Sequence, residues 1–291
     1  MKTVYSIFVF LLFVPLSIAA QIATTNSPSN GGSMALAPAR FELEMKPGTE
    51  TTVVVNLDYR ALGISRQPVR IVASLNDWNI TKDGQVEYYR ANSRPRSASS
   101  WLIYSPGEAA VTPGTVHQIR VTISVPPNAA PGDHLTALII EQRPETLKLE
   151  QNVRQMIVRY RMASVFYIKV AGLTRNGSFE NLYAASGPEG IVVTPSLKND
   201  GNSVVRPIGS VKILDDEGKI VADIPEAETL PILAGNELSQ PVLIGKVLPP
   251  GNYTVKYRID FQNGGKVTEG VTELAVKPPQ IASSEKPKAK P

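Results

Sequence analysis

Two histidines and one acidic triplet are the residues whose types suggest catalytic or metal-binding chemistry. His117 opens a predicted strand and His134 follows a turn, so neither has a partner at metal-ligand spacing. The acidic residues 215–217 stand beside a glycine, which is typical of a solvated hairpin tip. The chain has no cysteine, and this excludes disulfides, thiolate catalysis and thiolate metal sites. We therefore expect no catalytic residue, no metal and no other cofactor, and we predict that the protein is not an enzyme.

Alternating arginines mark a second unusual feature, the segment "RQMIVRYRMASVFYIKV" at 154–170. Arg159 and Arg161 alternate with Tyr160 and Met162, and alternation with period two is typical of a strand. The segment holds neither glycine nor proline. As one strand it would be about 55 Å long, whereas most strands have about 5–6 residues. We therefore predict one exceptionally long strand in the middle of the chain.

The N-terminal residues 1–20 resemble a secretory signal peptide. Lys2 is followed by an apolar stretch and by small residues at Ala19 and Ala20, where cleavage is expected. The alternative is an uncleaved anchor, but the stretch is shorter than the ~20 residues of a membrane span and contains Pro15. We therefore predict an exported protein, in the periplasm or on the cell surface, that contacts the membrane only through its signal peptide.

The rest of the chain is divided into short apolar runs closed by turn residues. The runs are rich in valine, isoleucine, threonine and tyrosine, and the chain has 24 prolines and 21 glycines. We predict an all-β protein with two tandem immunoglobulin-like β-sandwich domains, at 34–171 and 172–276, joined at a hinge. A flexible leader (21–33) and a disordered Pro/Lys tail (277–291) flank them. The best helix candidate, 145–156, is equally well explained as a loop.

Turn chemistry makes two more specific predictions. Pro131, Gly132 and Asp133 form a "PGD" turn before the run "LTALII". Residues 199–202 and 263–265 are rich in asparagine and glycine, so they are candidates for the positive-φ positions of hairpin turns. The net charge is only +4 and no basic cluster alternates with aromatic residues, so a nucleic-acid partner is not expected.

Several motifs together resemble the periplasmic pilus-assembly chaperones, the PapD-like family. They are "LAPARFELEMKPGTETTVVVNL", "LIYSPGEAAVTPGTVHQIRVTI", "NAAPGDHLTALIIEQRP" and "VRYRMASVFYIKV", in the order of that family's strands. The resemblance covers about residues 34–276 and implies a non-enzymatic chaperone or adaptor. It further implies that the strand at 154–170 binds a pilin-like or surface-protein subunit by β-strand addition.

The resemblance also implies two sets of client-binding residues. In this family, side chains of the long strand fill a gap in the client's core, and Met156, Val158 and Tyr160 are the candidates here. The alternative is that these three side chains face the protein's own core.

A second set would hold the client's terminal carboxylate, which the family binds with two basic residues in the cleft between the domains. Arg40, in "LAPARFEL", matches the member on the first strand. Counting back from "VFY" places Ser164 at the position of the second member, where Arg161 and Arg159 are the nearest basic residues. A charge-assisted pair at this point would fix the register of the client strand.

A different function is a cell-envelope scaffold or surface-binding module. The stretches "SLKNDGNSVVRPIGSVKILDDEGKIV" and "LPPGNYTVKYRIDF" resemble immunoglobulin-like repeats of exported structural proteins. In this case the leader and the tail would tether the protein, and the edge of the long strand would be covered.

Overall fold

A computed structural model describes residues 33–61, 67–143, 160–264 and 267–278. The predicted signal peptide, most of the predicted leader and tail, and the helix candidate at 145–156 lie outside the described residues. So do residues 154–159 of the predicted long strand. Within the described residues no helix is long and apolar enough to cross a membrane.

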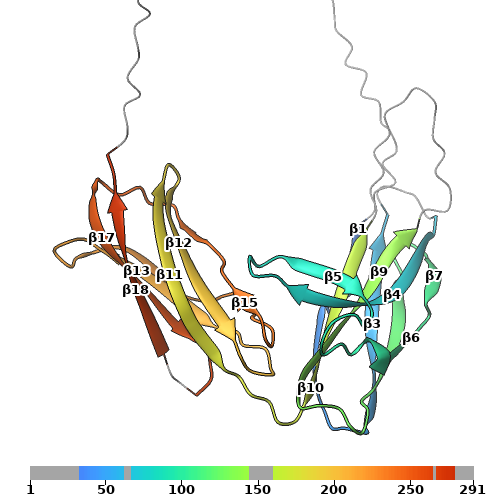
Figure 1. The fold of residues 1–291 in the computed structure, drawn as a ribbon. Helices are drawn as coiled ribbons and strands as arrows, with labels where there is room; N and C mark the ends of the chain where they lie inside the picture. Colours follow the sequence, from blue (N-terminus) through green and yellow to red (C-terminus); the bar gives the residue numbers. More distant parts are fainter. Residues whose placement is uncertain (1–32, 62–66, 144–159, 265–266, 279–291) are drawn as a thin grey trace, which may run out of the picture.

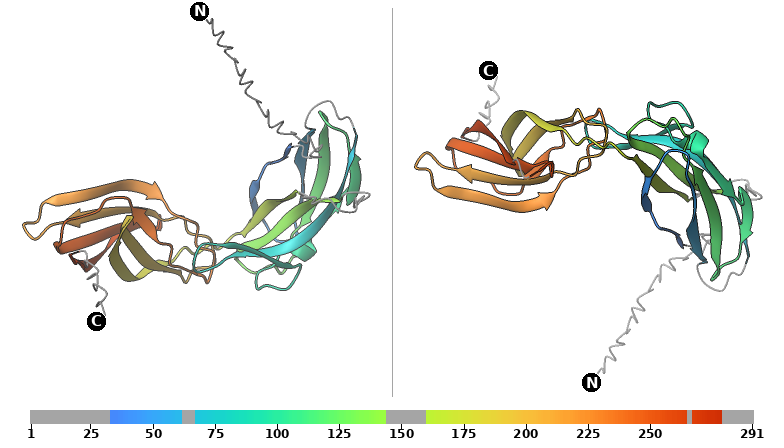
Figure 2. Two further views of the ribbon diagram at one scale, coloured as in Figure 1. Left: turned by 90° about the horizontal axis from the view of Figure 1, so that it is seen from above. Right: turned by 90° about the horizontal axis from the view of Figure 1, so that it is seen from below.

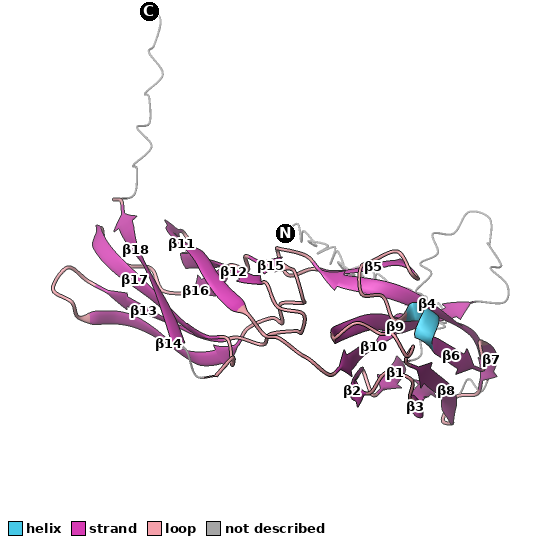
Figure 3. Ribbon diagram, turned by 60° about the horizontal axis from the view of Figure 1, so that its bottom comes forward, coloured by secondary structure: helices cyan, strands magenta, loops and turns pink. Residues whose placement is uncertain are grey.

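The described chain folds almost entirely into strands, which form two sandwiches (Figures 1 and 3). A single 3-10 turn, η1 (Ser99–Trp101), interrupts them. Figure 2 shows the two sandwiches lying end to end. The predicted fold class, two tandem immunoglobulin-like β-sandwiches, is confirmed, whereas the exact boundary at residues 171 and 172 stays a prediction.

The first sandwich packs two sheets around one apolar core. One sheet has the strand order β1-β3-β8-β6, and the other has the order β2-β10-β9-β4-β5 with β7 paired to β4. The strands are β1 (Ser33–Ala37), β2 (Arg40–Met45), β3 (Glu50–Arg60), β4 (Val69–Ile80), β5 (Val86–Arg90), β6 (Leu102–Ser105), β7 (Glu108–Val111), β8 (Val116–Ser124), β9 (Gly132–Arg143) and β10 (Arg161–Val170).

Pro38 divides the first predicted strand, "ALAPARFEL", between the two sheets. Proline has no N–H group and cannot continue a ladder of hydrogen bonds. Before it, β1 pairs antiparallel with β3; after it, β2 pairs parallel with β10. The chain thus changes sheets at Pro38, and β2 covers one side of β10 from Val165 onwards.

Strand β10 has one face in the core and the other at the domain junction. Its even-numbered residues Phe166, Ile168 and Val170 are buried in the core of the first sandwich. Its odd-numbered residue Tyr167 belongs to a separate cluster shared with the second sandwich. The described part of the predicted long strand is therefore a strand from Arg161 to Val170, and Tyr160 precedes it.

The second sandwich has its own core and two further sheets. Their strand orders are β11-β12-β15, with β16 also on β12, and β14-β13-β17-β18. The strands are β11 (Gly177–Gly187), β12 (Gly190–Asn199), β13 (Ile208–Leu214), β14 (Ile220–Glu228), β15 (Glu237–Leu238), β16 (Val242–Ile244), β17 (Gly251–Asp260) and β18 (Val267–Val276).

The turn prediction for residues 199–202 was wrong, whereas that for the acidic residues 215–217 was right. Residues 199–202 do not join a hairpin: β12 and β13 belong to different sheets, and the loop between them meets the first sandwich. Asn199 is buried and donates to the carbonyls of Ser203 and Ile232, so its amide fixes this loop instead of providing a positive φ. The acidic residues 215–217 do lie at the tip between β13 and β14, beside Gly218 with a φ of 80°.

Gly132 begins β9 in a conformation that other residues rarely adopt. Its φ is 114°, and a β-carbon placed on it would lie 2.5 Å from the Asn202 carbonyl oxygen and 2.5 Å from Arg96 Nη1. Because Asn202 belongs to the second sandwich, any side chain at residue 132 would push the two domains apart.

We therefore expect Gly132→Ala to lower the free energy of unfolding by about 2 kcal/mol or more, since it combines backbone strain with a steric clash. Gly48→Ala is the matched control, because Gly48 also has a positive φ, 77°, but has no atom within 4 Å of its β-carbon position. Urea unfolding of both variants checks this. Equal losses would mean that the domain contact contributes nothing to the effect.

Candidate functional site

The outer face of the sheet that contains β10 forms one wall of the junction between the domains. A buried apolar cluster there combines residues from both sandwiches. The Tyr167 ring meets Trp78 edge-on, with the ring centroids 5.3 Å apart. The cluster consists of Trp78, Ile80, Ala137, Ile139 and Tyr167 from the first sandwich and Val204 and Leu233 from the second.

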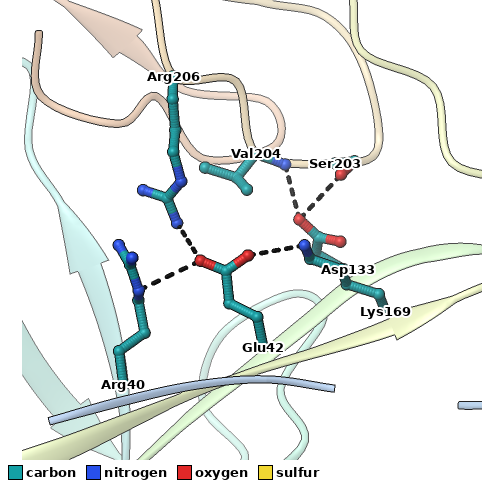
Figure 4. Close-up of polar contacts among 7 residues, drawn as sticks. All are labelled: Arg40, Glu42, Asp133, Lys169, Ser203, Val204 and Arg206. Carbon is teal, nitrogen blue, oxygen red and sulfur yellow. Dashed lines mark hydrogen bonds and ion pairs between the residues drawn. The ribbon is translucent and has the colours of Figure 1, made fainter. Parts of the chain in front are cut away.

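Glu42 stands at the centre of a charged group beside this cluster (Figure 4). Its Oε2 accepts a hydrogen bond from Lys169 Nζ at 2.7 Å. Its Oε1 lies 2.7 Å from Arg206 Nη2 and 3.2 Å from Arg40 Nε. Arg206 comes from the second sandwich, and its guanidinium also lies over the Tyr167 ring, 5.4 Å from the centroid. One carboxylate therefore joins three cations from β2, β10 and the second domain.

The titration of Glu42 follows from these neighbours. Burial alone would raise the pKa of Glu42, but the hydrogen bond from Lys169 and the charges of Arg206, Lys169 and Arg40 outweigh it and lower the pKa. Burial raises the pKa of Tyr167, and the charge of Arg206 opposes only part of this shift. The lowered pKa favours the ionised form of Glu42.

Asp133 makes the second polar contact between the domains (Figure 4). Its side chain is buried, and its Oδ2 accepts hydrogen bonds from Val204 N at 2.7 Å and Ser203 Oγ at 3.1 Å. Its backbone N–H donates to the carbonyl of Asn202 at 2.8 Å. Charge-assisted bonds of this kind contribute about 1.5–3 kcal/mol each, so Asp133 ties the start of β9 firmly to the 202–204 loop.

The hairpin of β4 and β5 makes a third contact, away from the hinge, and reaches towards β15 in Figure 1. Asn236 Nδ2 donates to Asn79 Oδ1 at 2.7 Å and to the carbonyl of Ile80 at 2.8 Å. At the hairpin tip, Lys82 pairs with Glu237 at 2.8 Å, and its carbonyl accepts a bond from Ser239 N at 2.6 Å. The hairpin therefore braces the second sandwich at a point distant in sequence from the hinge.

Among the residues that the structure describes, the N-terminal part of β10 has no strand beside it on one edge. The Tyr160 carbonyl accepts a bond from Gln142 N on the β9 side, whereas Val165 N donates to Ala39 O on the β2 side. Because these directions alternate along a strand, the backbone groups of Arg161 and Ala163 point to the β2 side. No described strand pairs with β10 there before Val165.

Arg40 and Arg161, two of the predicted anchor residues, lie on the same face of the sheet. Arg40 is paired with Val165, four residues after Arg161, or ~13 Å along the strand. Arg40 bonds to Glu42, while Arg161 lies over the Tyr88 ring with its Cζ 5.9 Å from the centroid. Arg40 and Arg161 therefore lie on the same surface but contact different groups.

The other predicted residues fall on the opposite face or outside the described residues. Ser164 is fully buried, and its hydroxyl donates to the Pro38 carbonyl at 2.8 Å. Tyr160 is half-buried just before β10. Met156, Val158 and Arg159 lie outside the described residues, so their roles stay predictions.

Sequence reasoning missed Glu42, Lys169 and Arg206. A signal existed for the first two: in "RFELEM" and "FYIKV" a charged residue alternates with core residues, which places it on the outer face of the sheet. No comparable signal existed for Arg206, because its contact with Glu42 depends on how two domains are placed.

The two histidines lie on different sheets. His134 is on β9, where its Nε2 lies 2.9 Å from the Ala130 carbonyl and its ring packs on Trp101. Burial lowers the pKa of His134. His117 is on β8 in the other sheet. Within the described residues, no group of three or more histidine, aspartate or glutamate side chains is placed to hold a metal ion.

Comparison with models of protein families gives no match, and comparison with curated proteins gives none either. Among solved structures, the chain is similar to the class 5 fimbriae chaperone CfaA, at 12% identity and a TM-score of 0.41, over 84% of this chain and 100% of that one. It is also similar to a chain of a chaperone–tip adhesin complex of CFA/I fimbriae biogenesis, at 10% identity and a TM-score of 0.43, over 83% of this chain and 98% of that one.

A third similar structure is the CsuC–CsuE complex of a chaperone and a tip subunit from the archaic chaperone-usher Csu pili of Acinetobacter baumannii. Its identity is 14% and its TM-score 0.39, over 83% of this chain and 98% of that one. These proteins come from the chaperone family that the sequence motifs resemble. At these identities and TM-scores, the likeness alone assigns no function to this chain.

The charged group predicts a pH-dependent contribution of Glu42 to stability. Because its pKa is lower in the folded protein than the ordinary 4.5, the contribution is present above about pH 4.5 and is lost as the pH falls through the folded pKa. We expect Glu42→Gln to lower the free energy of unfolding by about 1 kcal/mol at pH 7. The loss is small because the ion pairs of Glu42 are partly exposed and screened by solvent.

Urea unfolding at pH 7 and at pH 3 measures the difference, which should shrink at the lower pH. Glu44→Gln, on the same strand but without an ion pair among the described residues, is the control. A difference that stays constant between the two pH values would show that the charge of Glu42 is not the cause.

Proposed function

We propose that this protein is a non-enzymatic, exported chaperone or adaptor that binds a partly folded protein subunit by β-strand addition. The client, a pilin-like or other surface protein, pairs with β10 on the side that β2 leaves uncovered. Main-chain hydrogen bonds supply the affinity, and the side chains that alternate along the strand select the client.

The open edge of β10 between Arg161 and Ser164 carries this proposal. An exposed edge is a hazard for aggregation, and proteins usually cover it or shorten it. Here the next strand of the sheet begins only beside Val165, because the chain changes sheets at Pro38. The uncovered part continues directly into the segment that holds Met156 and Val158, which we propose as client-contacting side chains together with Tyr160.

Positively charged side chains beside this edge would attract a client that carries a negatively charged group such as a carboxylate. Arg161 is exposed and, among the described residues, forms no ion pair. Arg40 is also exposed but already bonds to Glu42. We therefore propose that Arg161 holds the client's carboxylate, and that Arg40, ~13 Å further along the sheet and bonded to Glu42, acts on it only through its charge. The buried hydroxyl of Ser164 supports the strand from inside.

Ala163→Pro tests strand addition directly. It removes an N–H group that points to the open side and is not used in bonds to β9, so the fold should survive while client pairing is blocked. We expect the amount of client that co-purifies to fall at least ~10-fold. The variant loses one main-chain hydrogen bond to the client, and its proline ring also crowds the client strand. Ala163→Ser keeps the N–H group and is the matched control.

The measurement is co-purification of the exported protein from its own host, with mass spectrometry of the proteins that elute. Thermal unfolding of each variant confirms that it is folded. If the same exported proteins elute with Ala163→Pro as with the wild type, the edge is not the binding site. If no protein elutes with the wild type, the scaffold function becomes the better explanation.

The anchor is tested with Arg161→Ala and Arg40→Ala in the same experiment. Losing a charge-assisted bond to the client costs about 1.5–3 kcal/mol, so Arg161→Ala should weaken binding at least ~10-fold. Arg40→Ala should weaken it less than ~5-fold, because an exposed pair that already has a partner contributes under about 1 kcal/mol. Unchanged binding in both variants would remove the anchor but leave strand addition intact.

A further inference from the structure

The start of β9 is the place where contacts to the second sandwich meet contacts within the first. The backbone N–H of Asp133 donates to the Asn202 carbonyl at 2.8 Å, and two residues later that of Leu135 donates to the Arg96 carbonyl at 2.9 Å. His134 lies between these two points. Because side chains alternate along a strand, its ring lies on the face opposite to Asp133. A movement of His134 would therefore disturb the contact between the domains.

The His134 ring is enclosed, and one of its two nitrogens has no partner. The residue is only 7% exposed, and its ring centroid lies 4.3 Å from that of Trp101. Nε2 lies 2.9 Å from the Ala130 carbonyl, whereas Nδ1 is buried and has no hydrogen-bond partner among the described residues. The neutral ring with its proton on Nε2 fits this site, because Nε2–H donates to the carbonyl. A second proton, on Nδ1, would find no acceptor.

Two charged groups act on this ring, and they have opposite signs. Burial is the main cause that lowers the pKa of His134 below the ordinary 6.5, and the positive charge of Arg96 lowers it further. The bond to the Ala130 carbonyl and the negative charge of Asp133 oppose this shift only in part. The other elements packed against the ring add no titratable side chain: η1 contains two serines and Trp101, the loop 126–131 has the sequence PPNAAP, and β10 presents its core residues Phe166, Ile168 and Val170.

A charged His134 ring has to leave this place to reach water. The Trp101 ring attracts a cation, but this attraction is weaker than the cost of a buried charge whose N–H group has no acceptor. The turn beside the ring has no room on its other side, since a β-carbon on Gly132 would lie 2.5 Å from the Asn202 carbonyl oxygen. When the ring moves out, the turn that contains Gly132 and Asp133 must therefore move away from Asn202.

We propose that His134 is an acid-sensitive latch of the domain junction: when its ring takes up a second proton, the turn 130–133 leaves the 202–204 loop and the second sandwich is free to reorient. The latch is closed above about pH 6.5, where the ring is neutral, and it weakens as the pH falls below this value, because the solvated ring of the open form binds the proton more readily. The pKa of Glu42 is lower than 4.5, so its ion pairs stay intact in this pH range. The latch does not depend on the proposed client.

The distance between two spin labels, one on each sandwich, tests this proposal in the full chain. The chain has no cysteine, so Ile103→Cys on β6 and Glu273→Cys on β18 provide the only two labelling sites, and both positions are exposed. Pulsed EPR measures the distribution of distances between the labels. We expect this distribution to be at least ~2-fold wider at pH 5 than at pH 7.5, and to narrow again when the pH is restored.

Two variants that cannot take up the proton identify the residue responsible. His134→Gln keeps an N–H donor for the Ala130 carbonyl, and His134→Phe keeps a ring beside Trp101. In both, the distribution at pH 5 should stay as narrow as at pH 7.5. The matched control is His117→Gln, which replaces the only other histidine, on β8 in the other sheet, and should widen at pH 5 as the unaltered chain does. Thermal unfolding at pH 7.5 confirms that each variant is folded.

The protonation step is measured separately by NMR, because the unaltered chain gives signals from only two histidine rings. The signal that His117→Gln retains belongs to His134, and it should titrate below pH 6.5. The proposal is overturned if the labelled chain has the same distance distribution at both pH values, or if the widening persists in the His134 variants. A His134 signal that titrates at or above pH 6.5 would overturn it as well.

Discussion

The placement of the second sandwich depends on the carboxylate of Asp133. Its Oδ2 receives two hydrogen bonds from the 203–204 segment, and the neighbouring Gly132 allows the close approach of Asn202 that these bonds require. With this contact in place, Arg206 comes within reach of Glu42, and Val204 covers the outer face of the β10 sheet. Charge-assisted bonds to a buried carboxylate are directional, so they set a defined angle where apolar packing alone would allow sliding.

Strand β10 is constrained from both faces and from one edge. Its core face fills the first sandwich, and its outer face supports the domain junction through Tyr167. Its pairing with β2 is cut short at Val165, because Pro38 turns the chain from one sheet to the other. Among the described strands, the open edge is therefore a consequence of the sheet change at Pro38.

Local patterns were enough to predict the β-class, the two sandwiches and the hairpin tip at 215–217, because period-two alternation and turn residues act over short distances. Local patterns did not predict the role of residues whose contacts lie far away in the sequence. Asn199 belongs to a loop rich in asparagine and glycine, yet its amide bonds to Ile232. Likewise, Arg40 was identified through the family resemblance, but the approach of Arg206 to its partner Glu42 depends on the domain angle, which no local pattern encodes.

The internal carboxylate Glu42 changes what a client can gain from the cations at the junction. Arg40, Lys169 and Arg206 already share one negative charge, so a client carboxylate would gain only the difference between its own contacts and those of Glu42. For partly exposed pairs this difference is below about 1 kcal/mol, whereas each main-chain hydrogen bond along an open edge contributes about as much without displacing a partner. Strand pairing must then supply most of the affinity, and the register of a bound client is set by the side chains that alternate along β10.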